Sequence, residues 1–209
     1  MRLAIIGAGN VGSALSRAAV GAGHTVSVSA TSREKASAVA AATGARAAED
    51  NVDAVAEAQV VVFAVPGSVV NTIARELAPA LAGKVVIDAT NPLNATFTDL
   101  DIEETAAAQT LQSRLPGVPV VKALNTIFAG RFGSPVMGGV RLDAFYAGDD
   151  AEAKETVAEF LASLGFRPVD AGALRMARSL EEMAFLNISL NAANNWSWQT
   201  GWSLLGPTQ

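Results

Sequence analysis

The chain has 209 residues, a formal net charge of −5 and no cysteine. Half of the residues are hydrophobic and only 17% are charged, which favours a folded chain with a large apolar core over a disordered one. The charges form no lysine and arginine cluster, so we expect neither nucleic acid nor anionic lipid as a partner. The absence of cysteine excludes thiolate chemistry, and the single histidine, His24, argues against a histidine-based metal site. Any redox chemistry must therefore come from a bound cofactor.

The N-terminal apolar run is short and ends at Gly7. It is too short for the apolar region of a signal peptide, and no run in the chain approaches the roughly 20 residues of a membrane-spanning helix. We therefore expect a cytoplasmic protein with no membrane partner.

The first half of the chain alternates between short apolar runs and helical patterns. The runs that predict strands are residues 3–6, 24–29, 60–65 and 85–88. Between them, helical patterns cover residues 10–20 and 32 to about 44, where Gly44 is a plausible C-cap, and a further helix is closed by Gly83. The runs at 60–65 and 85–88 are continuously β-branched, which is typical of strands buried on both faces.

The second half continues with predicted strands over residues 118–121 and 142–146. Asp149 and Asp150 then precede an amphipathic helix, followed by a short edge strand over residues 166–169. The tail from 173 to 205 is expected to be mainly helical and contains all three tryptophans. These elements predict an α/β protein with six or seven strands, a Rossmann-type doubly wound, mostly parallel sheet with a small helical appendage. We expect a dinucleotide-binding domain over 1–149 and a small segment over 150–209 that packs on it.

A glycine-rich turn lies between the first strand and the first helix. It matches the pattern G-x-G-x-x-G and consists of Gly7, Ala8, Gly9, Asn10, Val11 and Gly12. In this context the glycines allow a tight turn, close approach of the backbone to a pyrophosphate, and close packing of helix on strand. The free N–H groups at the helix N-terminus favour an anion there. We predict that the turn binds the pyrophosphate of a dinucleotide.

The end of the second strand favours NADP over NAD. An NAD site should carry Asp or Glu about 20 residues after the glycines, to bind the ribose 2′-hydroxyl. Here the chain has Thr31, Ser32 and Arg33 instead, whose hydroxyls and guanidinium can bind a 2′-phosphate, and Lys35 adds charge. Alternatively, Ser32 only caps the helix and Arg33 is solvated; the two roles can coexist. We expect NADPH to bind more tightly than NADH.

Other strand ends supply the remaining candidate residues, because ligands of open α/β sheets bind beyond the carboxyl ends of the strands. Val65 and Pro66 follow one strand, while Asn91 and Pro92 follow the next. Asn91 can form a turn or donate its amide to ribose or nicotinamide, and turn formation alone explains these residues equally well.

Asn125 and Thr126 follow a third strand and are the leading candidates for contacting the nicotinamide or its redox partner. Lys122 is either a general base or, as we favour, a solvated side chain, while Asp88 is expected to cap a loop. His24 is interpreted as a turn residue.

The residues show no Ser-His-Asp, Cys-His or paired-carboxylate pattern. Hydride transfer between two bound redox molecules requires chiefly proximity and orientation, and it can proceed without a protein acid or base. The sequence therefore favours this kind of reaction and no metal.

Taken together, six segments resemble the coenzyme F420-dependent NADP reductases. They are residues 7–12, 31–35, 88–93, 122–126, 148–150 and 168–172. The pattern is also similar to the nucleotide-binding domain of STEAP-type ferric reductases.

The resemblance implies an NADP(H)-dependent oxidoreductase that transfers hydride between NADPH and a deazaflavin. It also implies that the segment around Thr200, Gly201 and Trp202 walls the pocket of the hydride acceptor, that Thr126 lies there too, and that the protein is a homodimer. Trp196, Trp198 and Trp202 either stack on a flavin-like ring or belong to the core or dimer interface of the last helix.

Other functions compete with this one. A flavin or a ferric complex is an alternative acceptor, and a protein that only senses NADP(H) is an alternative of another class. A β-hydroxyacid dehydrogenase or imine reductase is disfavoured, because about 60 residues after Asp149 do not suffice for the large helical domain of those enzymes.

Overall fold

A computed structural model of the chain describes residues 1–96, 98–101 and 105–207. Its main sheet has eight strands in the order β10-β9-β6-β5-β4-β1-β2-β3. The strands of this sheet are β1 Arg2–Ile6, β2 Thr25–Ser29, β3 Arg46–Ala47, β4 Val60–Phe63, β5 Val85–Asp88, β6 Val120–Ala123, β9 Asp143–Gly148 and β10 Arg167–Asp170. Neighbouring strands are parallel except β6 and β9, which pair antiparallel. The fold is thus the predicted Rossmann-type, mostly parallel α/β arrangement.

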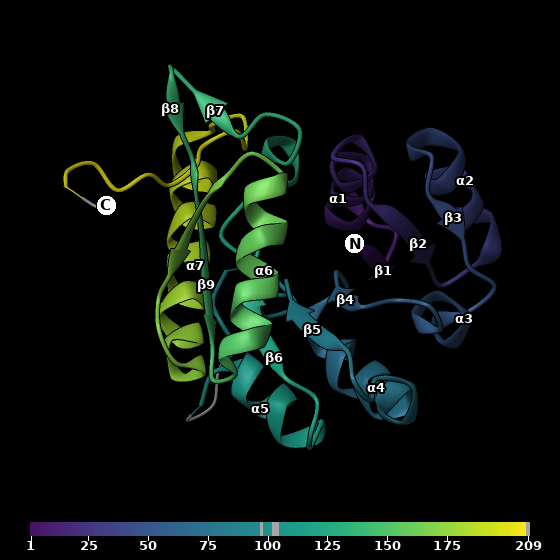
Figure 1. The fold of residues 1–209 in the computed structure, drawn as a ribbon. Helices are drawn as coiled ribbons and strands as arrows, with labels where there is room; N and C mark the ends of the chain where they lie inside the picture. The colour runs from purple at the N-terminus through teal and green to yellow at the C-terminus, as the bar shows by residue number, and fades with distance from the viewer. Residues whose placement is uncertain (97, 102–104, 208–209) are drawn as a thin grey trace.

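Helices cover both faces of the sheet (Figure 1). They are α1 Asn10–Gly21, α2 Arg33–Thr43, α3 Asn51–Val55, α4 Gly67–Leu77, α5 Ala107–Arg114, α6 Ala151–Ser163 and α7 Ala177–Asn194. The short helices η1 Ala78–Ala80, η2 Ala129–Arg131 and η3 Leu174–Met176 and a small hairpin of β7 Val136–Met137 and β8 Val140–Arg141 complete the described elements.

The side chains of strand β1 show why helices must cover both faces of the sheet. Leu3 and Ile5 face a core shared with α1, α2 and α6, while Ala4 and Ile6 face a core shared with α3, α4 and α5. Since successive side chains of a strand point to opposite faces, a strand that is apolar throughout must be covered on both sides. Helix α6 crosses in front of β6 and β9, and α7 lies on the other side of β9 (Figure 1).

Local capping signals are confirmed in detail. The Ser32 hydroxyl accepts from the Lys35 N–H at the start of α2, and Gly44 ends that helix with a left-handed φ of 83°. The Asp150 carboxylate accepts from the Ala153 N–H at the start of α6.

Several fold predictions were wrong. The sheet has one strand more than predicted, because β3 is only two residues long and has too few residues to show a period. The β7–β8 hairpin was missed for the same reason. The tail is mainly helical, as predicted, but α7 ends at Asn194 and residues 195–207 have no regular structure, so the placing of the tryptophans on the last helix was wrong.

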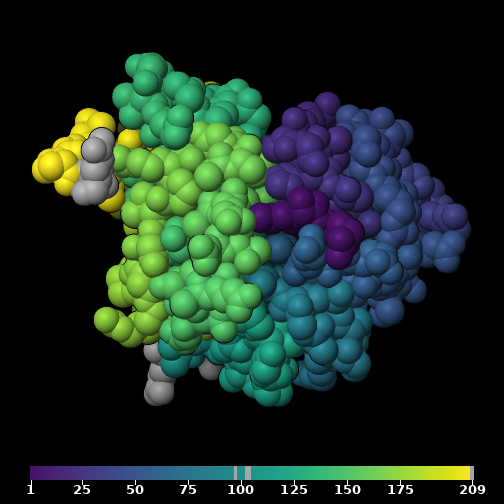
Figure 2. All heavy atoms as spheres, in the orientation of Figure 1, coloured from purple at the N-terminus to yellow at the C-terminus, as the bar shows by residue number. Residues whose placement is uncertain are grey.

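The segment after Asp149 is part of the same body. Strand β10 pairs with β9, and Phe160 of α6 lies in the core that contains Leu3 and Ile5. The green residues of this segment lie directly against the purple N-terminal residues (Figure 2). Residues 150–207 therefore pack on residues 1–149, while the boundary at 149 stays a prediction.

Candidate functional site

The carboxyl ends of β1, β2 and β4 border a cavity of about 320 Å³, which we call the glycine-loop pocket. Its lining comprises Ile6, Gly7, Ala8, Gly9, Ala30, Thr31, Lys35, Asn51, Ala64, Val65, Pro66 and Ile73. The predicted pyrophosphate turn, two of the predicted 2′-phosphate residues and one predicted strand end thus meet at one pocket.

Two glycines of the turn cannot be replaced without movement of the backbone. Gly7 has a φ of 116°, and a Cβ there would clash with the carbonyl of Ala64. A Cβ at Gly12 would clash with the carbonyl of Gly7. Helix α1 begins at Asn10 with Gly9 as N-cap and no side-chain cap, so its first N–H groups are available to an anion.

The 2′-phosphate candidates combine both predicted roles. Ser32 caps α2, while the Arg33 Nη1 lies 3.7 Å from Glu49 Oε1. The side chains of Arg33 and Glu49 are 72% and 74% exposed, so this ion pair contributes little to stability and leaves the guanidinium able to turn. Thr31 and Lys35 line the glycine-loop pocket beside them.

A second cavity, of about 170 Å³, lies between the start of α1, the ends of β5 and β6, and α7. We call it the α7 pocket. Its lining comprises Val11, Ala89, Asn91, Leu124, Asn125, Thr126, Ile127, Phe128, Ala129, Ala184, Asn187 and Ile188. A cavity of about 150 Å³ accepts one benzene ring, so this pocket is large enough to receive an aromatic ring.

Asn91 and Asn125 hold each other in this pocket. Asn91 Nδ2 donates to the Asn125 carbonyl, and Asn125 Nδ2 donates to Asn91 Oδ1 and to the Leu180 carbonyl, each at 3.0 Å. The orientation of the Asn125 amide is therefore fixed. Its buried Oδ1, and the buried Oγ1 of Thr126, have no hydrogen-bond partner within the described residues.

Such unpaired groups fit the carboxamide of a nicotinamide. A buried polar atom without a partner costs about 1–3 kcal/mol, so two of them side by side in sequence indicate a ligand that completes them. A primary amide offers N–H donors for Asn125 Oδ1 and a carbonyl for the Thr126 hydroxyl. The residues present thus fit the group that the sequence implied.

Backbone strain marks the same place. Leu124 lines the α7 pocket and has a φ of 69°, in the left-handed region that disfavours residues with a Cβ. Residues held in such conformations cluster at ligand sites, where the surrounding structure over-determines them. Here the strained residue delivers Asn125 and Thr126 to the cavity.

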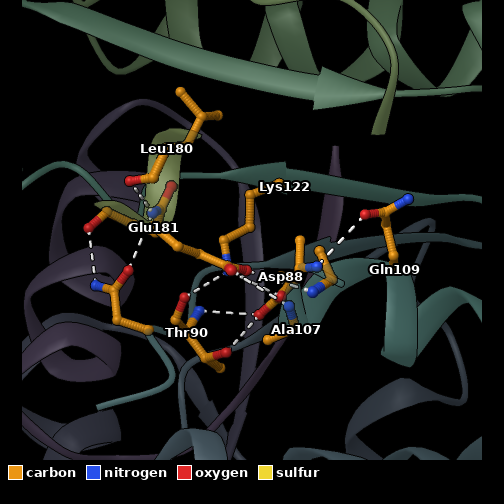
Figure 3. Close-up of polar contacts among 11 residues, drawn as sticks. Asp88, Thr90, Ala107, Gln109, Lys122, Leu180 and Glu181 are labelled. Atoms are coloured by element: carbon orange, nitrogen blue, oxygen red, sulfur yellow. Dashed lines mark hydrogen bonds and ion pairs between the residues drawn. The ribbon is translucent and has the colours of Figure 1, made fainter. Parts of the chain in front are cut away.

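Behind the pocket lies a buried ionic triad of Lys122, Asp88 and Glu181 (Figure 3). Lys122 Nζ lies 3.0 Å from Asp88 Oδ2 and 2.9 Å from Glu181 Oε1, and it donates to the Thr90 carbonyl at 2.6 Å. All three charged side chains are at most 1% exposed. The prediction of a solvated Lys122 was therefore wrong, because its partner Glu181 comes from a distant helix that the strand pattern does not reveal.

The triad joins four elements. Asp88 ends β5 and also accepts from the N–H and hydroxyl of Thr90, which confirms its predicted capping role. Glu181 of α7 accepts from the N–H groups of Ala107 and Ala108, at the start of α5. Its neighbour Leu180 holds Asn125, so the triad sets where α7 lies relative to the α7 pocket.

Electrostatic attraction to two carboxylates keeps the Lys122 amine protonated. Burial alone would lower the pKa of its amine, but the nearby carboxylates of Asp88 and Glu181 outweigh that effect and raise the pKa above its ordinary value. Lys122 is consequently a cation at neutral pH and is unsuited to act as a general base.

The remaining predicted residues lie around these pockets. Pro92 lines a separate cavity with Gly67, and Asn10 is exposed at the start of α1. Thr200 donates to Asn187, which lines the α7 pocket. Gly201 lies against Leu142, and Trp202 packs on a cluster that includes Met176 and Met183. Neither Gly201 nor Trp202 lines the α7 pocket, and their assignment to an acceptor pocket stays a prediction.

His24 lies at the amino end of β2, away from both pockets. Its Nδ1 is 3.1 Å from the Met1 amine and its Nε2 is 2.7 Å from Ser163 Oγ. This location agrees with the predicted turn role. Within residues 1–96, 98–101 and 105–207 no cluster of metal-ligating side chains and no helix able to span a membrane is found.

Sequence reasoning missed the contribution of α7. Glu181, Asn187 and Asn191 are buried on this helix, yet they form no known motif. The available signal was limited to the i, i+4 spacing of Asn187 and Asn191, because Glu181 lies six residues before Asn187 and outside the helical period.

Comparisons with known proteins place this geometry in context. The family model for coenzyme F420-dependent NADP oxidoreductases matches residues 2–92. An F420-dependent NADP reductase of Methanothermobacter thermautotrophicus is 31% identical over 93% of this chain and 90% of its own length. A crystal structure from Arthrobacter sp. FB24, of a protein proposed to be an F420-dependent NADP reductase, superposes with a TM-score of 0.86 at 28% identity and covers 98% of this chain and 100% of that one.

Two further similarities, of low coverage or low identity, support fewer conclusions about this chain. The rat metalloreductase STEAP3 is 38% identical, but only over half of this chain and 21% of its own length. An imine reductase from Pseudomonas sp. has a TM-score of 0.72 at 19% identity; 93% of this chain aligns with 63% of that chain. At that identity the likeness shows the fold alone.

We predict that Lys122→Met lowers the free energy of unfolding by about 3–5 kcal/mol, because it leaves two carboxylates buried without their cation. The neutral triple variant Asp88→Asn/Lys122→Met/Glu181→Gln keeps acceptors for Thr90 and α5 and should recover most of this loss. Urea unfolding measures both. Equal losses in the single and triple variants would contradict the assignment.

The free energy of unfolding should also depend on pH. Because the folded pKa of Lys122 is raised above 10.5, its stabilisation is present at neutral pH and is lost as the pH rises through that folded value. The wild-type protein should therefore lose stability at strongly alkaline pH, and the triple variant should lose less.

Proposed function

The chain belongs to the family of F420-dependent NADP reductases and is an NADP-dependent oxidoreductase, and we propose that it transfers hydride between NADPH and a deazaflavin of the coenzyme F420 class. The observation that carries this proposal is the α7 pocket, where the unpaired Asn125 Oδ1 and Thr126 Oγ1 fit a nicotinamide carboxamide.

The two pockets suit the two ends of NADPH. The glycine turn and the start of α1 bind the pyrophosphate, while Thr31, Ser32, Arg33 and Lys35 bind the 2′-phosphate. Val65 and Pro66 line the glycine-loop pocket, and Val11 lines the α7 pocket beside the turn. The cofactor would thus run along the carboxyl edge of the sheet, from β2 to β6.

The chemistry requires orientation more than proton transfer by the protein. NADPH supplies a hydride and becomes NADP⁺, and the deazaflavin accepts that hydride and one proton from solvent. Asn125 and Asn91 orient the carboxamide, Leu124 and Ile127 provide apolar contact that excludes water, and the triad keeps α7 in place. The cation Lys122 is not needed at the reacting atoms.

The direct test mixes the purified protein with NADPH and coenzyme F420 and follows the absorbance of the oxidised deazaflavin. Rapid loss with the deazaflavin, and none in parallel reactions with FMN or ferric citrate, is the expected result. NADPH oxidation only with FMN or ferric citrate would contradict the proposed acceptor. No oxidation with any acceptor would favour a protein that senses NADP(H).

We predict that Arg33→Ala weakens binding of NADPH at least tenfold and leaves NADH unaffected, because a charge-assisted hydrogen bond contributes about 1.5–3 kcal/mol. Fluorescence titration with both nucleotides measures this. Arg75→Ala, an exposed change on α4, is the matched control and should alter neither affinity. A parallel fall for NADPH and NADH would show that Arg33 does not bind the 2′-phosphate.

We also propose that the protein is a homodimer that uses an exposed apolar surface around α7. Leu186 and Leu190 lie one turn apart on α7 and are 50% and 38% exposed, and Trp196 and Trp198 in the next segment are each 45% exposed. Sedimentation at micromolar concentration should give a dimer, and Leu186→Lys/Leu190→Lys should give a folded monomer. A wild-type monomer would contradict this proposal.

A further inference from the structure

The buried face of α7 continues beyond the triad as a chain of amides. Asn187 and Asn191 are 5% and 0% exposed and lie one turn apart. After α7 the backbone turns back through Asn195 and Trp198, whose φ values of 54° and 60° are both left-handed. These disfavoured conformations bring the N–H of Trp198 to within 3.1 Å of Asn191 Oδ1.

This backbone N–H fixes the direction of every hydrogen bond that follows. Because a backbone N–H can only donate, the atom of Asn191 that faces it is the oxygen. Asn191 Nδ2 then donates, lying 2.7 Å from Thr200 Oγ1, 2.9 Å from the Asn187 carbonyl and 3.1 Å from Asn187 Oδ1. The Thr200 hydroxyl, having accepted from Asn191, donates to Asn187 Oδ1 at 2.7 Å.

The consequence is an amide of known polarity at the α7 pocket. Asn187 Oδ1 accepts from the Thr200 hydroxyl and also faces Asn191 Nδ2, so the Nδ2 of Asn187 must point the other way. That nitrogen has no hydrogen bond within the part of the chain that the structure describes, and Asn187 lines the α7 pocket. The pocket thus holds a free N–H donor from α7.

We propose that Asn187 donates this N–H to a carbonyl oxygen of the hydride acceptor, and that Thr200 and Asn191 are positioning residues that fix its direction. The inference rests on the proposed function, which it deepens by naming how the acceptor is recognised. Asn187 lies seven residues after Leu180, the residue that holds Asn125, or roughly 10 Å along the helix. This separation along α7 favours contacts of Asn125 and Asn187 with different groups.

The chemistry favours an acceptor ring with carbonyl groups. Every side chain that lines the α7 pocket is uncharged, so a cationic imine would find no counter-charge there. In a deazaflavin, the negative charge that arrives with the hydride is shared by the carbonyl oxygens of the pyrimidine ring. A donor at such an oxygen binds more strongly as the charge develops and so favours the transition state.

The first variant is Asn187→Asp, which keeps an oxygen for the donors from Thr200 and Asn191 but replaces the free N–H by an oxygen. Two dissociation constants are measured by fluorescence titration: that of NADPH for the free protein, and that of coenzyme F420 for the protein saturated with NADP⁺. The F420 constant should rise roughly tenfold or more, while the NADPH constant stays unchanged. The KM for F420 should rise in parallel.

The second variant, Asn191→Asp, does not touch the pocket. Its side chain still accepts from Trp198, but it can no longer donate to Asn187. The Asn187 amide must then turn over and present its oxygen to the acceptor, so this variant should reproduce the selective loss of F420 binding. Asn194→Asp, at the exposed end of the same helix, is the control for charge and should have no effect.

Several outcomes would overturn the inference. An unchanged F420 constant in Asn187→Asp would do so, even if Asn191→Asp fails to fold. An equal rise in the NADPH constant would assign Asn187 to the nicotinamide instead. If the wild-type protein reduces F420 but the variants behave like it, only this inference fails. If the wild-type protein neither binds nor reduces F420, the proposed function fails with it.

Discussion

One buried cation organises the candidate site. Lys122 is buried at the carboxyl edge of the sheet, where its charge must be balanced by carboxylates. These are Asp88 of β5 and Glu181 of α7. Removing the amine would leave two buried carboxylates without their cation, and the ion pairs that prevent this restrict α7 to one position against β5 and β6. Because Leu180 and Asn187 lie on that helix, the position of α7 determines both the orientation of Asn125 and the lining of the α7 pocket.

Within that frame the site is arranged for orientation. Hydrogen bonds fix the amides of Asn125 and Asn187, and each leaves one polar atom for a ligand. Leu124 is held in a disfavoured conformation between the strand and these groups. Transfer of a hydride between two rings gains most from such pre-organisation, because the entropy of alignment is lost when the protein folds and not during the reaction.

The sequence was sufficient where structure is local. The strands β1 and β4 could be predicted from continuous apolar runs, and the pyrophosphate turn from Gly7 and Gly12 in their strand-to-helix context. It was insufficient where a partner lies far along the chain. The burial of Lys122 depends on Glu181, which lies on α7. The direction of the Asn187 amide depends on the turn at Trp198. That turn follows the end of α7, which the composition of the tail does not reveal.

The central claim is that hydride passes directly between two rings at the α7 pocket. A single turnover with NADPH that carries deuterium at both positions of C4, in ordinary water, tests it with coenzyme F420 as acceptor and mass spectrometry of the reduced product. The account predicts one deuterium bound to carbon in the reduced deazaflavin. Reduced deazaflavin that contains only solvent hydrogen would contradict direct transfer.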